Sequence, residues 1–83
     1  MDLADLDSVR RGARDVAALT SRIDVLVENA GVMERVHSLT PQGYERTFGI
    51  NVLGHFVLRH QLFDCGLLTD ARVVVLTGDI YVL

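Results

Sequence analysis

The chain has 83 residues, of which 49% are hydrophobic and 23% are charged, and its formal net charge is −3. This composition fits a globular domain and excludes a disordered chain, and the lack of a basic surplus argues against nucleic acid as a partner. No apolar run approaches the ~20 residues of a membrane span, and the acidic N-terminus has no signal-peptide pattern. The single Cys65, expected to be a small buried hydrophobe, cannot form an internal disulfide. We therefore expect at most one domain, with no membrane span, in the cytoplasm.

The first part of the chain predicts a helix and a strand. Apolar residues recur at three- and four-residue steps over about residues 5–19, with Asp5 as a plausible N-cap. These apolar positions are Leu6, Val9, Ala13, Val16 and Ala17. Residues 23–27 are almost continuously apolar, which is typical of a strand buried on both faces and favours a parallel sheet.

A second helix is expected over residues 41–63, because Thr40-Pro41 has the pattern of an N-cap followed by proline at the first helical position. Gly43, Gly49 and Gly54 would each cost about 1 kcal/mol relative to alanine in a helix interior. We interpret these glycines as points where the helix closely approaches the sheet or a ligand. The alternative is a frayed or kinked helix.

The remaining residues predict a second strand at 72–76, after Cys65-Gly66 ends the helix. The order helix, strand, helix, strand gives an α/β chain with a two-stranded parallel βαβ core. Since the carboxyl ends of parallel strands meet at one edge, Asn29-Ala30-Gly31 and Thr77-Gly78-Asp79 are expected to lie together there, where such sheets bind ligands.

These features, in this order, resemble the middle of a short-chain dehydrogenase/reductase of the retinol-dehydrogenase-like branch. The resemblance rests on Asp2-Leu3, on Asn29-Ala30-Gly31, on the stretch from Gly43 to Phe56, and on the strand at 72–76. It implies a partial Rossmann-type three-layer fold. Residues 1–83 would then be an incomplete NAD(P)-binding domain that runs from the end of the third strand to the fifth strand.

The resemblance also implies roles for individual residues. Asp2 would contact the adenine ring, the backbone of Asn29, Ala30 and Gly31 would line the nicotinamide ribose, and Asn51 would be the catalytic asparagine. The cofactor of the intact parent would be NAD or NADP. Its reaction would be hydride transfer to or from a small-molecule alcohol or carbonyl substrate.

Several positions depart from the family pattern. The chain has no lysine, so the Tyr-x-x-x-Lys pair of the family cannot be present, and Tyr81 is interpreted as an ordinary tyrosine. Glu28 stands where the first asparagine of the Asn-Asn-Ala-Gly motif is expected, and a carboxylate there must find hydrogen-bond donors or stay hydrated. Gly78 aligns with the catalytic serine, and the glycine-rich cofactor turn is missing. We therefore expect the chain to be inactive alone, as a natural truncation or an incomplete reading frame.

Two other readings of the sequence stay open. The chain could be a truncated, non-catalytic relative that binds a partner, and the 41–63 helix could mediate homo-oligomer formation.

Both crossover helices should lie on one face of the sheet, which leaves the other face bare. His55 and His60 are five residues apart and do not share a helix face, so we expect no metal site and interpret His55 as a capping or packing residue.

Overall fold

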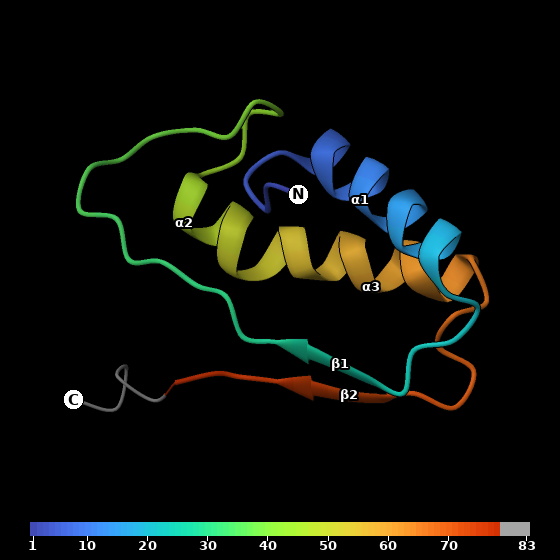
Figure 1. The fold of residues 1–83 in the computed structure, drawn as a ribbon. Helices are drawn as coiled ribbons and strands as arrows, with labels where there is room; N and C mark the ends of the chain where they lie inside the picture. The colour runs from blue at the N-terminus through green and yellow to red at the C-terminus, as the bar shows by residue number, and fades with distance from the viewer. Residues whose placement is uncertain (79–83) are drawn as a thin grey trace.

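The computed structural model describes residues 1–78. The elements are, in order, α1 (Leu6–Leu19), β1 (Val25–Glu28), α2 (Arg46–Phe48), the π-helical segment η1 (Gly49–Gly54), α3 (His55–Asp64) and β2 (Arg72–Val75). α2, η1 and α3 follow one another without a break and form a single helical rod, which lies with α1 on one side of the two strands (Figure 1). The predicted order of elements and the α/β class are confirmed.

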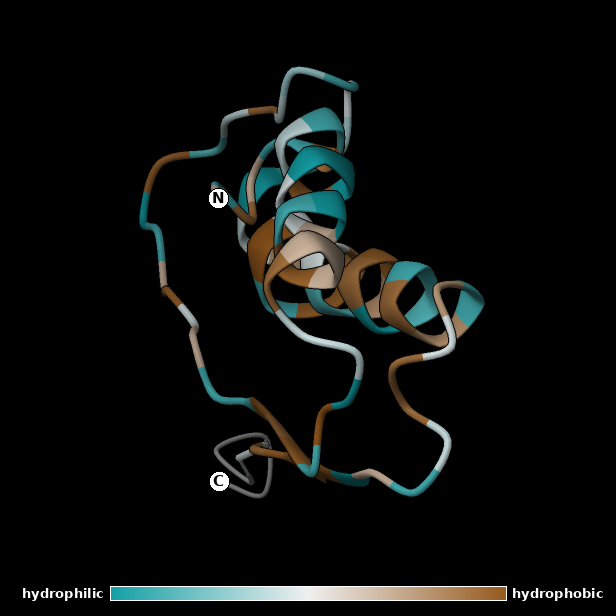
Figure 2. Cartoon of the chain, turned by 45° about the vertical axis from the view of Figure 1, so that its right-hand side comes forward, coloured by the Kyte–Doolittle hydropathy of each residue, from teal (hydrophilic) through white to brown (hydrophobic). Residues whose placement is uncertain are grey.

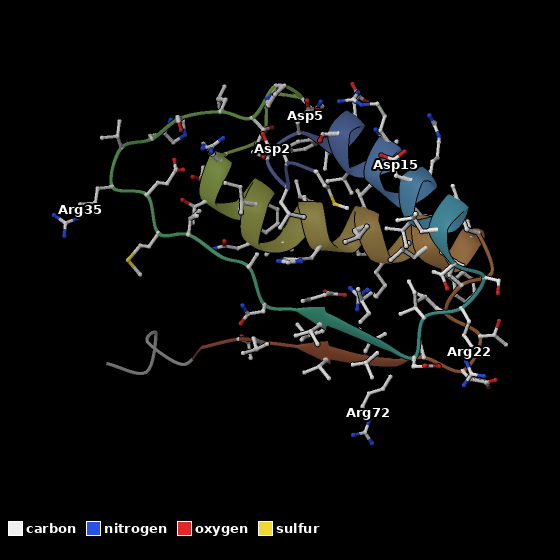
Figure 3. The ribbon with its side chains drawn as sticks, viewed as in Figure 1. Asp2, Asp5, Asp15, Arg22, Arg35 and Arg72 are labelled. Carbon is white, nitrogen blue, oxygen red and sulfur yellow. The ribbon has the colours of Figure 1, made fainter. Side chains whose placement is uncertain are left out.

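The two strands pair in parallel, as predicted, with Leu26 opposite Val73 and Glu28 opposite Val75. Because side chains alternate along a strand, Leu26 and Glu28 face the helices whereas Val25 and Val27 face away from them. Both outward-facing valines of β1 are 54% exposed. On β2, the side chain of Arg72 also points away from the helices (Figure 3). The described residues thus build two layers of the three-layer fold, and one face of the sheet is bare, as expected.

Helix α1 begins where the sequence predicted. The carboxylate of its N-cap, Asp5, accepts hydrogen bonds from the backbone N–H of Asp7 at 3.0 Å and from Nε2 of Gln42 at 2.9 Å. The bond from Gln42, followed by those from backbone amides, holds the pKa of Asp5 below its ordinary value. Val9 and Ala13 are buried against the helical rod, while the other side of α1 carries hydrophilic residues, which appear teal in Figure 2.

The predicted start of the second helix is wrong, since Thr40 begins a turn and not the helix. The hydroxyl of Thr40 accepts from the backbone N–H of Tyr44 at 3.1 Å, and the N–H of Gly43 donates to the carbonyl of Thr40 at 2.9 Å. Gly43 has φ of +90°, a left-handed conformation that suits glycine and closes the turn. A threonine followed by proline can open either a helix or a turn, and here the glycine decides for the turn.

The helical rod begins five residues later than predicted, after Glu45. The carboxylate of Glu45 accepts from the backbone N–H groups of Thr47 and Phe48, both at 2.9 Å, and so caps the first turn. The bond from Phe48 is the main cause that lowers the pKa of Glu45 below its ordinary value. The sequence pattern missed this cap because glutamate is an uncommon N-cap residue, whereas threonine is a preferred one.

Gly49 and Gly54 are the first and last residues of η1, and both allow close approach, as predicted. A Cβ on Gly49 would lie 2.6 Å from the side-chain methyl of Thr40, and a Cβ on Gly54 would collide with the backbone carbonyl of Leu3. The partners are therefore the turn at Thr40 and the N-terminal segment. The expectation of contact with the sheet or a ligand is wrong for these two glycines, and Gly43 lies outside the helix.

Helix α3 ends just before Gly66, as the sequence predicted. Gly66 has φ of +77°, its N–H donates to Phe63 O at 2.9 Å, and the N–H of Leu67 donates to Leu62 O at 3.1 Å. This Schellman pattern brings Leu62 and Leu67 together in the main core, where they pack with Ala13. Cys65, at the C-cap, is exposed, so the expectation that it is buried is wrong.

The segment between β1 and the helical rod runs as a long loop that is attached to the rod by its side chains. The guanidinium of Arg46 contacts the carboxylate of Glu34 at 2.7 Å, and the N–H of Arg46 donates to Ser38 O at 2.9 Å. Arg35, between these attachments, points outward (Figure 3). Within residues 1–78, no helix is both long enough and apolar enough to span a membrane.

Candidate functional site

A pocket of about 390 Å³ lies at the carboxyl ends of the two strands. It is lined by Asn29, Ala30, Gly31, Asn51, Leu76, Thr77 and Gly78. The two strand ends are fixed side by side because the N–H of Leu76 donates to Glu28 O at 3.0 Å, which continues the parallel pairing by one residue. The predicted meeting of the two turns at one edge is confirmed for these residues, while Asp79 and Tyr81 lie outside the described part.

Both the oxygen and the nitrogen of the Asn51 carboxamide form hydrogen bonds with the backbone of Val32. Its Nδ2 donates to Val32 O at 2.7 Å, and the N–H of Val32 donates to its Oδ1 at 2.8 Å. Gly31 lies directly beside this contact, and a Cβ there would be 3.3 Å from the same Oδ1. The structure therefore brings Asn51 to the Asn-Ala-Gly turn, as the resemblance implied, and fixes the path of the chain after the turn.

The segment that carries Asn51 is π-helical, with Gly49 and Gly54 at its ends. π-helical turns are rare and are frequent at functional sites, because the extra residue redirects side chains that an α-helix would point elsewhere. The sequence predicted one helix over residues 41–63 that the glycines interrupt, with a frayed or kinked helix as the alternative, but it did not predict a π-helical segment. Its glycines were the available signal, since two of them five residues apart permit a local change of winding.

His55 is a contributor to the site that sequence reasoning missed. Its Nε2 lies 2.7 Å from the carbonyl oxygen of Ala30, and the residue is 8% exposed. A carbonyl can only accept, so Nε2 carries the proton in this contact. The interpretation of His55 as a capping or packing residue of the helix is incomplete. The signal was its position four residues after Asn51, which places both on one side of the helix.

Glu28 is buried at the end of β1, 4% exposed, and forms an ion pair with Arg59 from α3. The distance between Oε2 of Glu28 and Nε of Arg59 is 3.4 Å, and within residues 1–78 this oxygen has no hydrogen-bond donor of good geometry. The expectation that the carboxylate must find donors is met only in part. A buried carboxylate without its cation would be strongly destabilising, so Arg59 compensates for the departure of Glu28 from the family motif.

Asp2 does not line the pocket. Its carboxylate accepts from the N–H of Ala4 at 2.9 Å, and its own N–H donates to the hydroxyl of Ser8 at 2.9 Å, so it organises the entry to α1. Figure 3 shows Asp2 beside the start of that helix. Its role at the adenine ring stays a prediction.

The pocket can bind and orient a ligand, but it offers little for proton transfer. Its lining residues carry two carboxamides, one hydroxyl and the apolar side chains of Ala30 and Leu76, and its two glycines leave backbone accessible. These donors and acceptors can form hydrogen bonds with a neutral polar ligand. The described residues contain no group of three histidine, cysteine or carboxylate side chains placed to hold a metal ion.

A parallel βαβ core with a polar pocket beyond the carboxyl ends of its strands is part of a Rossmann-type α/β fold. A family model described as short chain dehydrogenase matches residues 1–78. The chain belongs to this family.

The relatives and the solved structure agree with this assignment. The chain is 48% identical to mouse retinol dehydrogenase 13 over 64 residues, which are 77% of this chain and 19% of that protein. It is 40% identical to mouse retinol dehydrogenase 14 over an alignment of 84 positions, which covers 98% of this chain and 25% of that protein. A crystal structure of a protein from Mycobacterium paratuberculosis matches with a TM-score of 0.72 and 41% identity, over 94% of this chain and 26% of that one. The chain thus spans about a fifth to a quarter of these proteins.

Proposed function

We propose that the intact protein containing this chain is an NAD- or NADP-dependent oxidoreductase that interconverts an alcohol and a carbonyl compound. The observation that carries the proposal is the bonding of Asn51 to the residue that follows the Asn-Ala-Gly turn, at an edge shared by two parallel strands. In a sheet of this kind the ligand lies beyond the carboxyl ends of the strands. The names of the relatives favour retinol, or another alcohol with a long apolar body, as the substrate.

The residues of this chain would bind and position, and the bound nicotinamide would supply or accept the hydride. Asn29, Ala30 and Gly31 would line the nicotinamide ribose through their backbone, with Gly31 leaving space for close approach. Asp2 would contribute near the adenine ring. The assignments of Asn29, Ala30 and Gly31 rest on the family resemblance together with the lining of the pocket, whereas that of Asp2 rests on the resemblance alone.

Asn51 would act as a catalytic asparagine by holding the site in shape. Both ends of its carboxamide are engaged by Val32, and a carboxamide is neither an acid nor a base near neutral pH, so this side chain would not itself transfer a proton. The proton-transferring tyrosine and lysine must come from elsewhere, because the chain contains no lysine. We therefore propose that the 83-residue chain is inactive alone and binds no dinucleotide with measurable affinity.

A chimera tests the function, and a titration tests the inactivity. In the chimera, this chain's residues up to Leu76 replace the matched residues of mouse retinol dehydrogenase 13, so that the position aligned with Gly78 keeps that enzyme's own residue, and retinol oxidation is measured with NAD and with NADP. We expect activity, and its loss in the Asn51→Ala version. A chimera that folds with a sharp melt but turns over no substrate would refute the proposed function. Fluorescence titration of the isolated chain with NADH and NADPH should give no saturable signal.

The second candidate, a partner-binding module, is favoured by one observation. Besides the bare valine face of the sheet, α3 exposes Phe56 at 57% and Phe63 at 67%. Such apolar area marks an interaction surface or a surface that the rest of a larger fold covers. Homo-oligomer formation through residues 41–63 and residence in the cytoplasm stay predictions.

A further inference from the structure

Three contacts between the helical rod and the end of β1 follow one regular pattern. Asn51, His55 and Arg59 are spaced four residues apart on the rod, and they contact Val32, Ala30 and Glu28 respectively. The partners are spaced two residues apart on the chain and run in the opposite direction. We refer to these three contacts as the ladder.

The spacing of the ladder has a simple geometric basis. Between His55 and Arg59, which lie in α3, four residues of α-helix rise about 6 Å, and two residues of extended chain span about 6.6 Å, so the two repeats nearly coincide. The other of the two steps, from Asn51 to His55, runs through the π-helical η1. Side chains four apart on a helix share a face, and residues two apart on an extended chain face the same way. One helix face can therefore hold the strand end and the whole Asn-Ala-Gly turn at three evenly spaced points.

His55 is the middle contact, and it holds the turn itself. The outer contacts attach the turn at its two flanks, through the carboxylate of Glu28 before it and the backbone of Val32 after it. Only His55 reaches a residue within the motif, the carbonyl of Ala30 at 2.7 Å. His55 is 8% exposed whereas Ala30 is exposed, so this contact is partly buried and is shielded from water on the side of the ring.

We propose that His55 is a positioning residue of the cofactor site: its Nε2–H fixes the carbonyl of Ala30 and thereby the orientation of the backbone that faces the pocket. If the Ala30 carbonyl were released, the peptide between Ala30 and Gly31 could rotate, because Gly31 offers little steric resistance. The proposal rests on the proposed function only in taking the pocket as the cofactor site. The mechanical role of His55 does not depend on that.

The test compares His55→Phe and His55→Gln, with His60→Phe as a matched control. Phenylalanine keeps a ring but has no donor, whereas glutamine can place its Nε2–H where the histidine had its own. His60 lies on the same helix and its contact, with Asp64 at 3.5 Å, is exposed and remote from the turn. Two readouts come from NMR: the ¹⁵N signals of the histidine rings and the ¹³C shift of the Ala30 carbonyl. The third is hydrogen exchange of the Val32 amide, which is followed by mass spectrometry at low protein concentration.

We expect a protonated Nε2 on His55 in the unaltered chain. We also expect a changed Ala30 shift in His55→Phe, with Val32 exchange about three- to tenfold faster, the size of effect that one lost hydrogen bond produces. His55→Gln should restore both readouts, and His60→Phe should leave them unchanged. A ring protonated only at Nδ1, or a His55→Phe variant with unaltered Ala30 and Val32 signals, would overturn the proposal.

The ring measurement needs no variant, so it can overturn the proposal even if His55→Phe does not fold. None of these readouts requires a cofactor. An inactive chimera with an intact ladder would therefore refute the proposed function and leave the role of His55 in place. An active chimera in which Nε2 of His55 is unprotonated would support the proposed function and refute the role of His55.

Discussion

Replacing Asn51 is the most direct test of the contact that shapes the candidate site. The Asn51→Ala variant loses both hydrogen bonds to Val32, of 2.8 and 2.7 Å. One hydrogen bond contributes a net stabilisation of about 0.5–1.5 kcal/mol, and the lower half of this range applies because both bonds are exposed. Losing the two bonds should therefore lower the free energy of local opening by about 1–2 kcal/mol. Exchange of the Val32 amide proton should therefore accelerate about 5- to 30-fold. The assay is residue-resolved hydrogen exchange followed by NMR.

The isosteric variant Asn51→Asp separates the two bonds. At neutral pH its carboxylate can still accept from the N–H of Val32 but cannot donate to the carbonyl, so two oxygens would face each other at the site of the shorter bond. We expect this variant to be at least as impaired as Asn51→Ala, and to recover in part below pH about 4, where the carboxyl is protonated and can donate. Val52→Ala, at the next residue, is the control. Unchanged Val32 exchange in Asn51→Ala, or a neutral-pH Asn51→Asp that behaves like the unaltered chain, would refute the reasoning.

The other predictions concern the core, the caps and the sheet. Leu62→Ala removes a side chain that is 2% exposed and should destabilise the helical layer by about 2–5 kcal/mol, seen as faster amide exchange in α1 and α3. The pKa values of Asp5 and Glu45 are lowered in the folded state, so their contribution to stability is complete above their unfolded values and is lost as the pH falls through the folded ones. Circular dichroism during acid titration should show α1 and α2 losing helix below pH about 4, and the double variant Asp5→Asn/Glu45→Gln should flatten this dependence. Because the valine face is bare, the chain should self-associate or unfold without a sharp transition, and Val27→Thr/Val74→Thr should sediment more nearly as a monomer. A sharp monomeric melt of the unaltered chain would contradict this.

Much of the fold could be predicted because local chemistry and burial pointed the same way. The apolar spacing of α1 and its aspartate cap, the continuous apolar strands and the glycine after Cys65 are each determined within a few residues. The start of the second helix could not be predicted, because Thr40 and Glu45 both offer side-chain oxygens to nearby amides. The choice between them depends on the turn closed by Gly43.

The candidate site was predicted in outline and missed in detail. The meeting of the two strand ends follows from parallel pairing, and the place of Asn51 follows from the family resemblance. The contact of His55 with Ala30 depends on the winding of η1 and on the register between helix and strand, which no local pattern encodes. For the same reason the partner of Glu28 could not be named, although the need for one could be stated.

The loop that follows Val32 has a practical consequence for variation in this chain. Its two flanks are anchored to Arg46 by the carboxylate of Glu34 and by the carbonyl of Ser38, while Val36 between them is 77% exposed. Extra residues inserted at 35–37 would extend outward and leave both anchors where they are, since lengthening a surface loop costs little closure entropy. This stretch is therefore a suitable point at which to insert a tag or a reporter.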